Sequence, residues 1–147
     1  MEAFEKKVWD SFGRQLFMAT LGAEMILVER GRVEIRFPFS SKLTQQNGFV
    51  HAGAVTSIMD SACGYAALSV APGQGEVLSV EFKVNFLAPA VGESFIARAS
   101  VKRAGKRLAV CAADSFAVKA GEEKLIATML ATIMNMDSKP AEAGSGD

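Results

Sequence analysis

One stretch of the chain, residues 45–63, combines side chains that can do chemistry with a local pattern that would hold them in place. It contains the only histidine, His51, beside a turn of small residues, and it sets one carboxylate, Asp60, into an otherwise apolar segment. An ionised carboxylate in apolar surroundings costs roughly several kcal/mol unless it is paired or functional. Such a group can deprotonate a water molecule or attack an electrophilic carbon itself. We therefore take residues 45–63 as the candidate active-site segment.

The element that must position Asp60 is a long helix. Residues 52–70 contain no Lys, Arg or Glu, which predicts a helix buried on nearly all sides. Its polar and small residues are Ser57, Asp60, Ser61 and Gly64, whose spacing of three, four and seven places them in one narrow stripe. That stripe is the candidate wall of a site.

The remaining pattern predicts one α+β domain over residues 1–136, followed by a disordered tail over residues 137–147. Apolar residues at four-residue intervals indicate an amphipathic helix over residues 1–20. Strand alternation then indicates a hairpin over residues 23–39 that turns at Arg30 and Gly31. After the buried helix, strand patterns cover residues 76–87, 93–103, 107–119 and 124–136. This order predicts a long central helix wrapped by a curved antiparallel sheet, with an additional N-terminal helix.

Bulk composition narrows the classes of function. The 147 residues carry 16 basic and 16 acidic side chains without a basic block, which argues against nucleic acid as a partner. No uncharged run approaches the roughly 20 residues of a membrane span, and the charged N-terminus does not read as a signal peptide. The two cysteines, Cys63 and Cys111, sit among alanines and valines, which suits buried thiols in a reducing cytoplasm. We therefore expect a soluble cytoplasmic protein without a metal.

The loop and helix together resemble a known family. Gln45, Gly48, His51 and Gly53, with an aspartate nine residues after the histidine and the segment 86–93, are similar to the hotdog-fold acyl-CoA thioesterases. The resemblance runs from about residue 21 to 134. Within the 4-hydroxybenzoyl-CoA thioesterase superfamily, the chain looks most like the phenylacetyl-CoA thioesterase-like group. It implies a hotdog fold and hydrolysis of an aryl or short- to medium-chain acyl-CoA to a free acid and CoA.

The resemblance also implies residue roles. The amide side chain six residues before the histidine helps to position the nucleophile or its water, and here it is Gln45, with Asn47 as the alternative if the register differs by two. The helix carboxylate is Asp60. The amides of Ala52 and Gly53 at the start of the helix would polarise the thioester carbonyl, although the family usually has glycine where this chain has Ala52. Ser79 matches a serine that assists the attacking water in some relatives, but strand alternation places it on the polar face.

Spacing along the helix predicts a shared site. Gly53 and Asp60 share a face but lie about 10 Å apart at roughly 1.5 Å per residue. At that separation, the amide and the carboxylate of one helix could barely both reach a single reacting carbon. Two such helices running antiparallel in a two-fold dimer would bring the amides of one chain beside the carboxylate of the other. We therefore predict an obligate homodimer with two composite sites, and pairing of dimers into a homotetramer.

Several assignments stay open at this point. His51 is expected to shape the turn rather than to act as a base. Arg103, Lys106 and Arg107 at a hairpin tip could meet CoA phosphates, although charged tips are usually only solvated. No resident cofactor is expected, and CoA enters as part of the substrate. An acyl-carrier-protein thioester is the alternative substrate. A non-catalytic acyl-CoA binding module and a hotdog hydratase or dehydratase are the competing functions.

Overall fold

In the computed structural model, residues 1–136 are described, so the predicted tail at 137–147 lies outside the described residues. The helices are α1 (Ala3–Arg14), α2 (Leu16–Leu21) and α3 (Ala52–Val70), with a 3₁₀ turn at Ser41–Leu43. The strands are β1 (Glu24–Glu29), β2 (Arg32–Pro38), β3 (Glu76–Phe86), β4 (Ser94–Ala104), β5 (Leu108–Lys119) and β6 (Glu122–Met136). These bounds follow the alternation and helical periodicity of the sequence to within a few residues.

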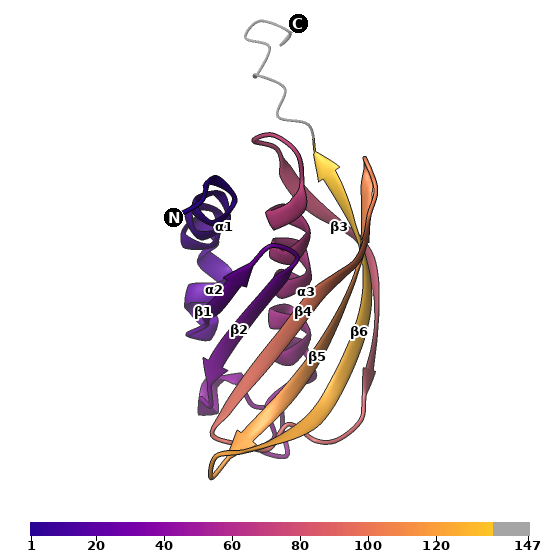
Figure 1. Ribbon diagram of the computed structural model, residues 1–147. Helices are drawn as coiled ribbons and strands as arrows, with labels where there is room; N and C mark the ends of the chain where they lie inside the picture. Colours follow the sequence, from indigo (N-terminus) through magenta and orange to yellow (C-terminus); the bar gives the residue numbers. More distant parts are fainter. Residues whose placement is uncertain (137–147) are drawn as a thin grey trace, which may run out of the picture.

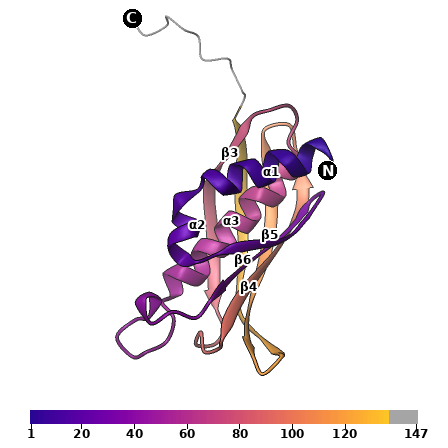
Figure 2. The same cartoon turned by 90° about the vertical axis from the view of Figure 1, so that its left-hand side faces the viewer.

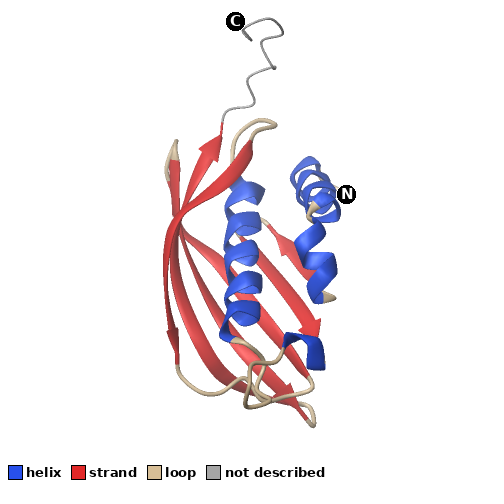
Figure 3. Cartoon of the chain, turned by 180° about the vertical axis from the view of Figure 1, so that it is seen from behind, coloured by secondary structure: helices blue, strands red, loops and turns tan. Residues whose placement is uncertain are grey.

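The six strands form one antiparallel sheet in the order β1-β2-β4-β5-β6-β3. The sheet curves around α3, which lies along its concave face (Figures 1 and 3). The side chains of α3 that face the sheet are fully buried, among them Ile58, Met59 and Leu68. Because both α3 and the inner face of the sheet are apolar, their contact forms the core. The predicted α+β hotdog architecture is confirmed.

The N-terminal segment forms two helices where the sequence pattern predicted one. The helix breaks at Gln15, whose backbone is extended at φ −84° and ψ 95°. The α1 helix crosses α3 on the side away from the sheet, and α2 continues at an angle to it (Figure 2). Lys7 Nζ donates hydrogen bonds of 3.0 and 3.1 Å to the carbonyl oxygens of Ala71 and Gly73 just after α3. These bonds fasten α1 to the C-terminal end of the central helix.

Among residues 1–136, neither edge strand of the sheet, β1 or β3, has a partner along its outer side. The β3 strand pairs with β6 on its inner side. Large apolar side chains gather on this strand, since Leu78, Val80, Phe82 and Phe86 are 54%, 55%, 41% and 51% exposed. An open edge with exposed apolar side chains is a surface for pairing with another strand.

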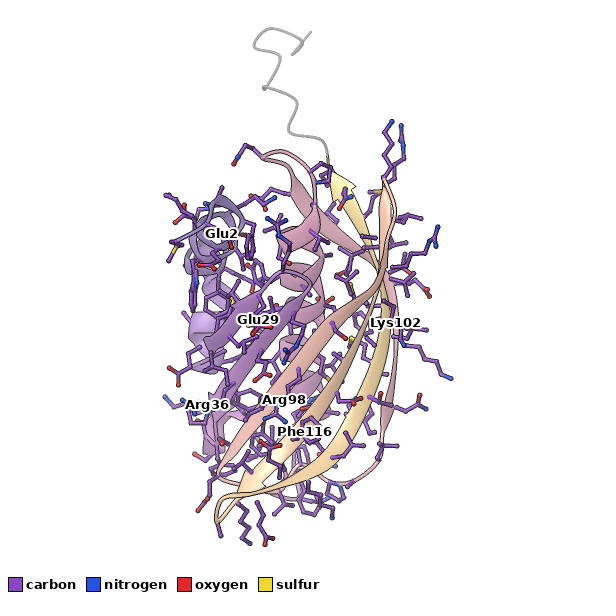
Figure 4. The ribbon with its side chains drawn as sticks, viewed as in Figure 1. Glu2, Glu29, Arg36, Arg98, Lys102 and Phe116 are labelled. Atoms are coloured by element: carbon purple, nitrogen blue, oxygen red, sulfur yellow. The ribbon has the colours of Figure 1, made fainter. Side chains whose placement is uncertain are left out.

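On the outer face of the sheet, Arg98 lies beside Phe116 (Figure 4) and forms an ion pair with Glu123. Arg98 donates two hydrogen bonds, of 2.7 and 2.6 Å, to the carboxylate of Glu123, and its guanidinium lies 4.9 Å from the centre of the Phe116 ring. The hydrogen bonds and charge of Arg98 hold the pKa of Glu123 below its usual range. These contacts join β4, β5 and β6 on the face opposite α3. Among residues 1–136, no helix is both long and apolar enough to cross a membrane.

Candidate active site

The side chain of Gln45 holds the loop before α3 in shape by hydrogen bonds to the loop's backbone. Its Oε1 accepts hydrogen bonds from the backbone N–H groups of Asn47 at 2.5 Å and Phe49 at 3.2 Å. The backbone N–H of Gln45 also donates to the Phe49 carbonyl at 2.8 Å. With its oxygen occupied in this way, the side chain keeps its NH₂ group as a donor. Gln45 lines a cavity at the start of α3 whereas Asn47 does not, and the choice between the two as the positioning amide stays a prediction.

His51 is the N-cap of α3. Its Nδ1 accepts a hydrogen bond of 2.7 Å from the backbone N–H of Gly53. A Cβ atom at Gly53 would lie only 2.9 Å from that nitrogen, so the capping contact requires glycine there. Because Nδ1 is the acceptor, the proton of the neutral ring sits on Nε2. This geometry agrees with the expectation that His51 shapes the turn.

The cap changes which amide is available to a substrate. We expected both Ala52 and Gly53 to polarise a carbonyl, but the N–H of Gly53 is already donated to His51. The N–H of Ala52 has no partner among the described residues and lies in the first turn of the helix. Such an amide carries the partial positive charge of the helix terminus and is a preorganised donor to an oxyanion. Of the two amides, only that of Ala52 is therefore left for an acceptor outside the helix.

A cavity of about 550 Å³ opens beside this amide. Its polar groups, from Gln45, His51 and Ala52, lie at the start of α3, and most of the remaining wall is apolar. That wall includes Phe49, Val55, Phe86, Leu87 and Pro89. We call this the amide cavity. It can hold an apolar group with a carbonyl oxygen directed at the helix terminus.

Asp60 is paired with a serine from the sheet. The hydroxyl of Ser79 on β3 donates a hydrogen bond of 2.6 Å to Asp60 Oδ1. This is a short, charge-assisted bond between a helix and the strand beside it. It supplies the partner that Asp60 was expected to need, and it leaves the second carboxylate oxygen, Oδ2, without a bonded side chain among the described residues.

The predicted face of Ser79 was wrong, and a β-bulge is the reason. The pairing of β3 with β6 shifts between Ser79 and Glu81, so Val80 is an extra residue in the strand. Ser79 and Phe82 therefore both pair with inward-facing, buried residues of β6. Simple alternation placed Val80 with Phe82 and put Ser79 on the opposite face. The bulge reverses this and turns the Ser79 hydroxyl toward α3.

Asp60 and Ser79 line a second cavity, of about 420 Å³, which we call the carboxylate cavity. It is bounded by the end of α1, the middle of α3 and the first half of β3. Ala52 and His51 do not line it, and Asp60 does not line the amide cavity. One chain thus carries the two halves of the predicted site in separate places.

The basic residues proposed for CoA phosphates lie elsewhere. Arg103, Lys106 and Arg107 flank the turn between β4 and β5, and the Lys106 and Arg107 carbonyls accept hydrogen bonds from Asn135 near the end of β6. This places the turn at the end of the sheet near the C-terminus of α3, away from Ala52 of the same chain. Their role stays a prediction.

Several groups in the carboxylate cavity were missed from the sequence. Ser11, Gln15 and Tyr65 line it together with Asp60. No motif or spacing marks Ser11 or Gln15, because the helix break that directs Gln15 inward has no glycine or proline at that position. Spacing does not mark Tyr65 either, since five residues at 3.6 residues per turn place it about 140° around α3 from Asp60.

The cysteines do not offer an alternative nucleophile. Burial raises the pKa of Cys111 to about 11 and raises that of Cys63 well above its usual range. A buried thiol kept protonated in this way is inert. Within residues 1–136, no three His, Cys, Asp or Glu side chains gather closely enough to hold a metal ion.

Comparison with known proteins identifies the class to which this fold and site belong. The family described as the thioesterase superfamily matches residues 47–124. The matched span contains His51, Asp60 and Ser79. The chain belongs to the thioesterase superfamily.

Particular relatives agree with this placement. A thioesterase family protein of Silicibacter pomeroyi has a TM-score of 0.89 at 52% identity, covering 91% of this chain and 98% of that one. The PaaI protein from the phenylacetic acid degradation operon of E. coli has a TM-score of 0.78 at 20% identity, covering 92% and 97%, which shows a shared fold. A curated protein of Saccharolobus solfataricus, provisionally named an esterase, is 36% identical over 90 residues, which are 61% of this chain and 59% of that protein. The chain therefore spans less than two thirds of this relative.

Proposed function

We propose that this protein hydrolyses acyl-CoA thioesters in sites shared between two chains, with Asp60 as the catalytic carboxylate and the Ala52 amide as the oxyanion donor. The observation that carries the proposal is the hydrogen-bonded pair of Asp60 and Ser79 in one cavity and the unpartnered Ala52 amide in another. A carboxylate and a helix-terminal amide are the two groups that attack on a thioester carbonyl needs.

A single chain cannot close both groups around one carbonyl. Ala52 and Asp60 are eight positions apart in α3, which is about 12 Å at roughly 1.5 Å per residue. An oxyanion donor and a base each lie about 3 Å from the atom on which they act. The gap is therefore too wide for one thioester carbonyl, and a second chain is needed.

The open edge of β3 supports one particular pairing. Ser79 lies beside Asp60, and Phe86 lines the amide cavity, so β3 passes both halves of the site. Antiparallel pairing of two β3 strands about a two-fold axis near Phe82 would set Ser79 of one chain opposite Phe86 of the other. The amide cavity of one chain would then meet the carboxylate cavity of its partner. Two equivalent composite sites result.

The faces that would meet in this dimer suit close packing. One stripe of α3 contains Gly53, which is exposed, and Ser57, Asp60 and Gly64, which are half-buried. The Ser57 hydroxyl donates to the Gly53 carbonyl at 2.7 Å, so it does not need a partner across the interface. Small residues allow two helices to approach closely, and β3 contributes its exposed apolar side chains. We propose a homodimer on these grounds, and pairing of dimers into a tetramer stays a prediction.

In the reaction that we propose, Ser79 holds Asp60 Oδ1 and leaves Oδ2 facing the thioester. Asp60 either takes a proton from a water molecule that attacks the carbonyl carbon, or attacks that carbon itself to form an anhydride that water then opens. In both routes negative charge develops on the carbonyl oxygen, where the partner chain's Ala52 amide stabilises it. Collapse of the intermediate breaks the carbon–sulfur bond, and the CoA thiolate leaves and is protonated.

The remaining roles are assigned as follows. Gln45 shapes the loop and offers its NH₂ group to the carbonyl or the attacking water, and His51 caps α3. Arg103, Lys106 and Arg107 are proposed to meet the CoA phosphates, because the two-fold pairing puts this turn at the same end of the dimer as the partner's amide cavity. No resident cofactor takes part, and CoA is part of the substrate. The free, buried thiols fit a cytoplasmic setting.

The test is release of free thiol from short-chain, long-chain and aryl CoA thioesters and from an acyl-carrier-protein thioester. Asp60→Asn is compared with Asp114→Asn, a matched change on the outer face, where Asp114 accepts a hydrogen bond from Thr128. We expect turnover of CoA thioesters that falls at least about 100-fold in Asp60→Asn and stays unchanged in Asp114→Asn. Tight binding without turnover would instead show an acyl-CoA binding module.

A further inference from the structure

Half of the residues that line the carboxylate cavity have uncharged polar side chains, in contrast to the mostly apolar amide cavity. The end of α1 supplies Ser11 and Gln15, and α3 supplies Ser61 and Tyr65 beside Asp60. Tyr65 is only 6% exposed and Ser61 only 8% exposed. Burying several polar groups around a cavity is unfavourable unless they find hydrogen-bond partners. A ligand group is one such partner.

The hydrogen bonds within the cavity wall leave two donor groups without an acceptor among the described residues. The Ser11 hydroxyl donates to the Tyr65 oxygen at 3.4 Å, which leaves the Tyr65 O–H proton for another acceptor. The Ser61 hydroxyl donates to Gln15 Oε1 at 3.1 Å, which leaves the Gln15 NH₂ group without a partner among the described residues. Burial raises the pKa of Tyr65, so its hydroxyl is a neutral donor at neutral pH.

These donors lie at a fixed distance from the reacting centre. Tyr65 follows Asp60 by five residues in α3, which is about 7.5 Å along the helix axis at roughly 1.5 Å per residue. Because both residues line the same cavity, this separation along the axis leaves room for an acyl chain of medium length whose carbonyl carbon sits at Asp60. The break between α1 and α2 brings Gln15 to the same place, so the N-terminal segment is part of the wall.

Charge in the cavity points to an uncharged ligand group. Two carboxylates, Asp60 and Glu76, are among the residues that line it, and no Lys, Arg or His is; Glu76 is paired with Arg14 at 3.0 Å. A second carboxylate on the acyl chain would meet like charge from the wall itself. A hydroxyl or keto oxygen carries no charge and can accept from Tyr65 and Gln15.

We infer that the carboxylate cavity holds the acyl group, and that Gln15 and Tyr65 select acyl groups carrying an uncharged hydrogen-bond acceptor at the end remote from the thioester. This inference rests on the proposed function and deepens it by naming the substrate class. Unsubstituted acyl chains leave the two donors unpaired, which weakens their binding in the transition state. Chains ending in a carboxylate are repelled.

The experiment compares three matched substrates, hexanoyl-CoA, 6-hydroxyhexanoyl-CoA and adipoyl-CoA, by kcat/KM. For the wild-type enzyme we expect 6-hydroxyhexanoyl-CoA to exceed hexanoyl-CoA by about threefold to tenfold. Adipoyl-CoA should fall below hexanoyl-CoA by about tenfold. In Tyr65→Phe and Gln15→Met the ratio of kcat/KM for 6-hydroxyhexanoyl-CoA to kcat/KM for hexanoyl-CoA should shrink toward one.

Thr20→Val is the control, because Thr20 lies on α2, is exposed and bonds only to its own helix backbone. It should keep the wild-type preference, and thermal unfolding of all three variants should confirm that they are folded. Equal kcat/KM for the hydroxylated and plain chains in the wild type would overturn the inference. So would a loss in Tyr65→Phe that is the same for every substrate. If no thioester is hydrolysed at all, the proposed function itself has failed.

Discussion

The two cavities that flank α3 are built in different ways. The polar end of the amide cavity depends on residues close together in sequence, since Gln45 accepts hydrogen bonds within its own loop and His51 caps the helix through Gly53. The carboxylate cavity joins Ser11, Asp60 and Ser79, which come from three separate elements. The first half is therefore a local motif, and the second exists only when the whole domain has folded. In the proposed dimer, neither half hydrolyses a thioester without the other half from a partner chain.

The largest effect should come from separating the halves. Phe82→Lys places a charge near the middle of the open β3 edge, where the two-fold pairing is proposed. We expect a folded monomer by light scattering and a loss of thioesterase activity of at least about 100-fold, because Ala52 and Asp60 no longer meet.

Ile26→Lys is the matched control for this change, since Ile26 is 40% exposed on β1, the other edge of the sheet. It should leave the dimer and its activity intact. A monomeric Phe82→Lys protein with full activity would show that one chain holds a complete site.

The next effect concerns the carboxylate half. Ser79→Ala removes the 2.6 Å hydrogen bond to Asp60 and should lower kcat by about tenfold, because a bond to a charged group is worth about 1.5–3 kcal/mol. KM should change little, since the serine acts through Asp60. Ser100→Ala, an exposed serine of β4, should have no effect in the same steady-state assay. An unchanged kcat in Ser79→Ala would remove Ser79 from the site.

The smallest effect concerns the amide half. If His51 acts as a helix cap, His51→Asn should keep most of the activity, because asparagine is a good N-cap residue. His51→Ala should lose about 1 kcal/mol of unfolding free energy and several-fold in activity. Denaturant unfolding and kcat measured on both variants check this. If the two variants were equally inactive with unchanged stability, His51 would be acting as a base.

The fold was largely predictable because its signals are local and periodic. The sequence pattern predicts the apolar helix at 52–70 and the alternating strands after it. Their order is enough to predict a helix wrapped by a sheet. The break at Gln15 was not predictable, because it depends on how α1 and α2 pack against the finished domain. The bulge at Val80 was missed for the same reason, since strand alternation assumes an unbroken ladder.

The candidate site also has features that the sequence predicts and features that it does not. A loop motif marks Gln45, His51 and Ala52 in the sequence, and a single charge in an apolar helix marks Asp60. The structure places the first three around one cavity and Asp60 in another, and their roles stay predictions. Sequence could not show that His51 occupies the Gly53 amide, which is a matter of side-chain geometry. It also gave no sign of Gln15 in the wall, because nothing local distinguishes that residue from any other glutamine.

The most direct test of the account is complementation between two inactive chains. Asp60→Asn and Gln45→Ala are co-expressed, so that random pairing makes half of the dimers mixed, each with one intact composite site. The account predicts recovery of about a quarter of the wild-type activity, where either variant alone is nearly inactive. A mixture no more active than the mean of the two variants would contradict a site shared between chains.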